Sequence, residues 1–324
     1  MTSARRVAVD TGMHIAYERY GDDGDPPLLM VSGFGVQLTA WNPDLVSMLV
    51  DRGLQLIVFD NRDVGLSTHL DELGPIDAMA LMAGQVIAPY LLSDMADDAA
   101  GLLDALGFAS AHILGVSLGG MIAQSLAIEH PSRVRSLTSI MSTPAFGVGA
   151  GTPTAAQALL SPPARTREDA VTRSLGIAAV IGSTAYERDE AWIREAVGIA
   201  WGRNNDPGGT TRQLAAVVLS PDRRPGLAEV SLPALVVHGE LDPLIQVEGG
   251  RETAAAIPEA ELMVLPGMGH DIPRALWETV VDAVVALVHR AEGTAQPAER
   301  SHPETNKHAR WGRLLNRESN GGTE

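Results

Sequence analysis

The chain has 324 residues, a formal net charge of −16 and no cysteine, and 45% of its residues are hydrophobic. This length and composition fit a globular protein with a large core, and no apolar run approaches the length of a membrane span. The charge disfavours nucleic-acid binding through phosphates, and the lack of cysteine excludes disulfides, thiolate nucleophiles and cysteine-ligated zinc. Because no apolar signal core follows residues 1–6, we expect a cytoplasmic protein without integral membrane association.

Hydrophobic runs alternate with helical patterns through the first 145 residues. They predict strands at 28–31, 56–59, 111–114 and 134–140, and helices at 43–52, 93–106 and 120–128, with Ser93 as the N-cap of the second helix. Alternation of this kind implies an α/β fold with a mostly parallel sheet that helices cover on both faces.

The alternation of strand and helix patterns stops between Pro144 and Asp222. Only helical patterns occur there, at 169–180, 189–201 and 210–219. Strands are again predicted at 234–238 and 261–265, followed by a helix over 273–290. We therefore expect an α/β core formed by residues 1–143 and 223–292, a helical cap at 144–222, and a disordered polar tail at 293–324.

The most informative motif is the pentapeptide from Gly115 to Gly119, which fits Gly-x-Ser-x-Gly. It follows a predicted strand and precedes a predicted helix, which is the setting of a nucleophile elbow. The motif therefore makes Ser117 the candidate nucleophile.

A serine nucleophile needs a histidine base and a carboxylate that orients it. His270 follows the last predicted strand in the glycine-containing loop 266–270, and Asp242 follows the strand before it. In parallel sheets, active residues lie beyond the carboxyl ends of strands. The order Ser117, Asp242, His270 along the chain is the one expected for this hydrolase architecture. Glu240 is a rival for the acid, but it sits nearer the strand end.

The tetrahedral intermediate of acyl transfer needs backbone N–H donors. We expect these donors to be Leu118, directly after the nucleophile, and Phe34, in the loop 32–35 after the first parallel strand. Glycines on both sides of Phe34 allow the backbone to turn inward.

On these stretches, together with the run from Asp60 to Asp63, the chain resembles the α/β-hydrolases with a helical cap over residues 7–290. More narrowly, it resembles the actinobacterial lipase/esterases grouped with aclacinomycin methylesterase. The resemblance implies Ser117, Asp242 and His270 as the triad and Phe34 and Leu118 as oxyanion donors. Ser32 is a departure, because many relatives have histidine there.

Two further groups of residues have a structural and a functional interpretation. For Asp60, Arg62 and Asp63 we favour the structural one, in which Arg62 bridges loops beneath the site. In the cap, Tyr186, Trp192 and Trp201 are candidates for lining a substrate pocket, although aromatic residues at helical spacing more often pack the cap against the core.

The sequence thus predicts a serine hydrolase that cleaves small-molecule carboxylic esters through an acyl-enzyme, with no cofactor and no metal. Two alternatives stay open: a hydrolase of C–C bonds or N-terminal proline amides with the same triad, and a non-catalytic binding protein. A proline aminopeptidase needs cap carboxylates, for which Glu187, Asp189 and Glu190 are available. The oligomeric state and the acyl preference are not determined by the sequence.

Overall fold

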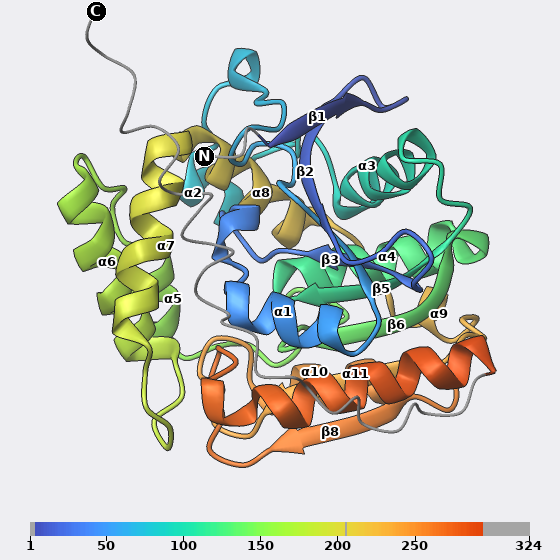
Figure 1. Cartoon of the computed structure of the whole chain (residues 1–324). Coiled ribbons are helices and arrows are strands. Elements are labelled where there is room, and N and C mark those ends of the chain that lie inside the picture. Colours follow the sequence, from blue (N-terminus) through green and yellow to red (C-terminus); the bar gives the residue numbers. More distant parts are fainter. Residues whose placement is uncertain (1–3, 205, 294–324) are drawn as a thin grey trace, which may run out of the picture.

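The computed structural model describes residues 4–204 and 206–293. Its centre is one eight-stranded sheet in the order β1-β2-β4-β3-β5-β6-β7-β8 (Figure 1). The strands are β1 (Arg5–Ala8), β2 (His14–Tyr20), β3 (Pro27–Val31), β4 (Gln55–Phe59), β5 (Ala111–Val116), β6 (Val134–Ile140), β7 (Ala234–Gly239) and β8 (Glu261–Leu265). Strand β2 pairs in antiparallel fashion with both β1 and β4, and the other neighbouring strands are parallel.

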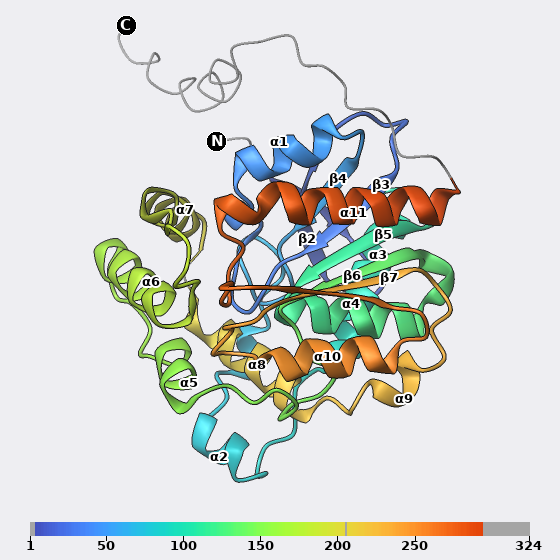
Figure 2. The same ribbon diagram turned by 90° about the horizontal axis from the view of Figure 1, so that it is seen from below.

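Helices cover both faces of the sheet (Figure 2). Outside the segment between β6 and β7, the helices are α1 (Pro43–Asp51), α2 (Ala78–Met82), α3 (Leu92–Ala105), α4 (Leu118–Glu129), α10 (Val247–Ala256) and α11 (Trp277–Glu292). Short 3-10 turns occur at Leu38–Ala40, Asp71–Leu73, Pro131–Arg133 and Arg274–Leu276. Alternate residues of β3 enter two core clusters: Leu28 and Met30 pack with α1 and α11, whereas Leu29 and Val31 pack with α3 and α4. Burial on both faces explains why a central strand such as β3 is apolar throughout.

The segment between β6 and β7 is helical, as predicted. It contains α5 (Pro153–Leu159), α6 (Arg167–Ile181), α7 (Glu190–Arg203), α8 (Pro207–Leu219) and α9 (Arg224–Leu227). Figure 1 shows α5, α6 and α7 grouped at one side of the molecule, beyond the sheet. In the described ranges, no helix is both long and apolar enough to cross a membrane.

The predicted cap of α3 was wrong. Leu91 is the N-cap and Ser93 lies inside the first turn, where Asp94 accepts a hydrogen bond from the Leu91 N–H at 2.7 Å. An acidic residue at the third helical position can satisfy the N-cap amide in this way, so the helix begins two residues earlier than a serine cap requires. The tail expected at 293–324 lies almost wholly outside the described residues.

Candidate active site

Ser117 lies in a strained turn between β5 and α4, with φ 55° and ψ −119°. The flanking glycines make this turn possible. A Cβ atom at Gly115 would lie 2.1 Å from the Gly119 carbonyl oxygen, and one at Gly119 would lie 2.1 Å from the carbonyl oxygen of Val31. Only glycine tolerates such close approach of the backbone. Backbone strain of this kind is concentrated at functional sites.

His270 connects Ser117 to Asp242. Its Nε2 lies 3.0 Å from Ser117 Oγ, and its Nδ1 lies 2.7 Å from Asp242 Oδ2. The His270 loop is held against the inserted helices, because the His270 N–H donates to the Ile181 carbonyl at 2.7 Å. The structure therefore brings the three predicted residues, from three different loops, into one hydrogen-bonded line.

Asp242 is oriented by its second oxygen. Oδ1 accepts hydrogen bonds from the N–H groups of Leu244 and Ile245, both at 2.9 Å, which leaves Oδ2 facing His270. A second histidine, His238, has its Nε2 3.6 Å from Oδ2, but that nitrogen donates to the Ile245 carbonyl at 2.7 Å. Burial lowers the pKa of His238, so it stays neutral beside the carboxylate.

The loop after β3 lies against Ser117. A Cβ at Gly33 would be 3.5 Å from Ser117 Cβ, and the Val36 N–H closes a turn onto the Gly33 carbonyl at 3.2 Å. Among the described residues, no acceptor pairs with the N–H of Phe34, within this turn, or of Leu118, the first residue of α4. Both predicted oxyanion donors therefore lie beside Ser117 with their N–H groups unpaired.

A cavity of about 820 Å³ lies between the core and the inserted helices, and Ser117 and His270 are in its wall. Trp192 and Trp201 line it, together with many aliphatic side chains. Tyr186 does not belong to the lining, and its hydroxyl donates instead to the Pro266 carbonyl at 2.9 Å. Of the three candidate aromatic residues, two face the cavity and one braces the loop that leads to His270.

Asp60, Arg62 and Asp63 are buried and form ion pairs. Arg62 binds both carboxylate oxygens of Asp98 on α3, at 2.6 and 2.8 Å, so it joins its loop to a helix rather than to a second loop. Burial opposes the charged guanidinium, but the hydrogen bond and charge of Asp98 prevail and raise the pKa of Arg62. Asp60 pairs with Arg203 at 2.8 Å and Asp63 with Arg212 at 2.7 Å. No local sequence pattern indicates these two partners, which lie about 145 residues further along the chain.

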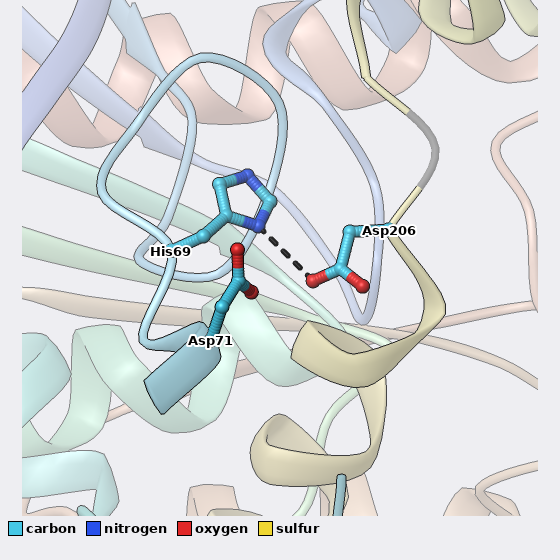
Figure 3. A group of neighbouring side chains, drawn as sticks. All are labelled: His69, Asp71 and Asp206. Carbon is cyan, nitrogen blue, oxygen red and sulfur yellow. Dashed lines mark hydrogen bonds and ion pairs between the residues drawn. The ribbon is translucent and has the colours of Figure 1, made fainter. Parts of the chain in front are cut away.

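One cluster in the described ranges has the composition of a metal site: His69, Asp71 and Asp206 (Figure 3). Its surroundings do not suit a cation. Arg212 Nη2 lies 3.3 Å from Asp71 and 3.6 Å from Asp206, and Asp206 also accepts the N–H groups of Gly208 and Gly209 at the start of α8. The cluster already contains a positive charge, and we assign no metal to it.

A model of the alpha/beta hydrolase fold matches residues 26–273, and the chain belongs to this family. It is 27% identical over 297 residues to the rhodomycin D methylesterase of Streptomyces peucetius, covering 85% of this chain and 94% of that protein. The rhodomycin D methylesterase of Streptomyces sp. strain C5 is similar to the same extent. The enol-lactonase of Burkholderia xenovorans has the same fold, with a TM-score of 0.68 at 22% identity over 88% of this chain and 99% of that one. The family resemblance expected from the motifs is thus confirmed.

Proposed function

We propose that the protein hydrolyses carboxylic esters through an acyl-enzyme formed on Ser117. The observation that carries this proposal is the line from Asp242 through His270 to Ser117, with 2.7 and 3.0 Å between the nitrogen and oxygen atoms. Similarity to methylesterases supports the same class of reaction.

In the first half of the reaction, Ser117 Oγ attacks the ester carbonyl carbon while His270 Nε2 takes the hydroxyl proton. The N–H groups of Phe34 and Leu118 hold the oxyanion, and Asp242 stabilises the imidazolium. His270 then gives the proton to the alkoxide, which leaves as the alcohol. In the second half, His270 deprotonates a water molecule, the hydroxide attacks the acyl carbon, and Ser117 regains its proton as the acid leaves.

The cavity supports a bulky, largely apolar substrate. Its volume of about 820 Å³ lies near the upper end of the usual range for small-molecule sites. Trp192 and Trp201 offer flat apolar surfaces in its wall. We infer that the acid part of the ester occupies this space and that the alcohol is small, as the names of the methylesterase relatives indicate for those proteins.

Peptide hydrolysis has less support. Of the cap carboxylates that could hold a substrate amine, Asp189 is the N-cap of α7 and pairs with Arg274 at 2.6 Å, and Glu190 is absent from the cavity lining. Only Glu187 is left in the lining without such a partner among the described residues.

The proposal is tested with p-nitrophenyl esters from acetate to palmitate, methyl esters of small and bulky aromatic acids, and a prolyl amide. We expect turnover of esters, faster for bulky methyl esters than for small ones, and none in the Ser117→Ala variant. Turnover confined to the prolyl amide, or ester turnover that survives in Ser117→Ala, contradicts the proposal.

A further inference from the structure

The loop that carries Phe34 is held in place by the inserted helices. The Gly35 N–H donates to Gln213 Oε1 on α8 at 2.9 Å. Gln37 donates from its side-chain amide to the carbonyls of Ala200 and Asn204, at the end of α7, at 3.0 and 2.8 Å. Two residues of the loop, on either side of Val36, are therefore fixed by a segment about 165 residues away in sequence.

Gln213 is suited to fix a backbone position. Its side chain is fully buried, with 0% exposure. Its amide group is used at both ends, since Oε1 accepts from Gly35 and Nε2 donates to the Arg62 carbonyl at 3.0 Å. A buried amide with both ends satisfied has one preferred orientation, because any other leaves polar atoms unpaired.

The helix that carries Gln213 is itself anchored. The preceding residue, Arg212, is 1% exposed and binds both oxygens of Asp63, at 2.7 and 2.9 Å. A Cβ at Gly209 would lie 2.1 Å from the Asp63 carbonyl oxygen, so α8 packs directly on the core backbone. Gly35, with φ 65°, has no room for a side chain either, because a Cβ there would lie 2.8 Å from Thr210 Cγ2. Loop and helix are thus in tight contact.

The core offers this loop little side-chain support at its start. Ser32, where relatives of the resembled family often have histidine, has a buried hydroxyl without a hydrogen-bond partner among the described residues. Asn61 donates to the Ser32 carbonyl at 3.1 Å, one residue before the turn. The next contact that orients the turn is the one from Gln213.

We propose that Gln213 is a positioning residue of the ester hydrolase, which aims the Phe34 N–H at the oxyanion by holding the adjacent peptide through Gly35. This rests on the proposed function. The inserted segment then does more than enclose substrate, because its α8 completes the oxyanion-binding site. Mispositioning one oxyanion donor weakens transition-state binding more than ground-state binding, so the effect belongs in kcat rather than KM.

The test compares Gln213→Leu, which removes both hydrogen bonds, with Ser220→Ala as the matched control. Ser220 Oγ accepts the Leu92 N–H at 2.9 Å, so this control also breaks one hydrogen bond between α8 and the core, but far from the loop in the chain. For Gln213→Leu we expect kcat to fall about 10- to 100-fold with KM within about threefold. Amide hydrogen exchange of the peptide 32–37 should be faster than in the parent. Ser220→Ala should change neither kcat nor the exchange of 32–37.

Two more variants keep the test decisive if Gln213→Leu does not fold. Gln213→Asn keeps the amide but shortens its reach, and we expect a smaller loss of kcat with faster exchange of 32–37. Gln213→Glu keeps the reach of the side chain and, when the buried carboxyl is protonated, both hydrogen bonds. Its kcat and its exchange of 32–37 should therefore be closer to those of the parent.

A folded Gln213→Leu or Gln213→Asn with parental kcat and parental exchange overturns the proposal. If the parent itself turns over no ester, the proposed function fails, and the exchange of 32–37 still decides whether Gln213 holds the loop.

Discussion

At the scale of single residues, the proposed chemistry depends on side chains that are almost removed from water. The side chains of His270 and Asp242 are 7% and 0% exposed. Charges that develop on them are therefore weakly screened, and the hydrogen bond between them is worth more than it is at a surface. Two backbone N–H groups donate to Oδ1 of Asp242 and fix its orientation, so Oδ2 faces His270 Nδ1.

This arrangement predicts a large effect of Asp242→Asn. The amide oxygen has to accept from Leu244 and Ile245, which turns the NH₂ group toward His270 Nδ1. Nδ1 must then be the acceptor, the proton moves to Nε2, and the imidazole no longer accepts the Ser117 proton. We expect kcat to fall by roughly 10³–10⁴-fold with an unchanged fold, measured on a p-nitrophenyl ester against Ser117→Ala as the background. An Asn variant with more than a tenth of parental kcat argues against this role.

The buried side chain of His112, the second residue of β5, predicts how stability depends on pH. Burial lowers its pKa from 6.5 to about 4, although the neighbouring Glu292 opposes the shift. Its other neighbours are Ser136, Arg135 and His289. Because the pKa of His112 is lower in the folded than in the unfolded protein, its contribution to the free energy of unfolding is fully present above about pH 6.5. That contribution is lost as the pH falls toward 4. The total loss from this group is about 3 kcal/mol.

The measurement is the free energy of unfolding in urea between pH 4 and 7.5 for the parent and His112→Gln. The glutamine retains polar atoms near Ser136 but does not titrate, so its stability should depend less on pH over that interval. Parallel pH profiles for the two proteins contradict the assignment to His112.

At the scale of elements, buried ion pairs attach α7 and α8 to the loop after β4. Asp60 with Arg203 and Asp63 with Arg212 are the two pairs, and the three side chains other than Arg203 are at most 1% exposed. Removing one partner of such a pair leaves an uncompensated buried charge. The tyrosine that also binds Asp63, Tyr90, cannot replace the missing cation.

We therefore expect Arg212→Met to lower the free energy of unfolding by about 3–5 kcal/mol, measured by urea denaturation. The double variant Arg212→Met with Asp63→Asn should recover part of the loss, since it removes the buried carboxylate too. If the single variant is as stable as the parent, the pair does not anchor α8.

Sequence patterns predicted the buried strands of the sheet. β3, β4 and β7 each contain four consecutive apolar residues. The order Ser117, Asp242, His270 follows from the loops after particular strands. The exposed edge strand β1, the antiparallel β2 and the helices α5 and α10 were not predicted, because short or half-exposed elements have weak periodicity. The contacts of Gln213, Arg203 and Arg212 are formed between distant segments, and no local pattern contains them.

At the scale of the whole molecule, the loops of one sheet carry the proposed triad, and an insertion between β6 and β7 lies beside them (Figure 1). The described residues that line the cavity all lie within 33–277. The described part of this site therefore lies wholly outside residues 296–324.

Deletion of 296–324 should therefore leave kcat/KM on a soluble short-chain ester within about threefold, an energy change near 0.6 kcal/mol. Tm should be nearly unchanged. A large loss on the soluble ester would mean that the tail reaches the site, whereas a loss confined to emulsified substrate would assign it to surface binding.

The central claim is that Ser117 is a nucleophile activated by His270, and covalent labelling tests it most directly. The protein is treated with a fluorophosphonate, and the adduct is counted by intact mass and located by peptide mass spectrometry. The account predicts one adduct per chain, on Ser117, formed at least 10³-fold more slowly in His270→Ala. Labelling at another serine, or equally fast labelling without His270, contradicts the account.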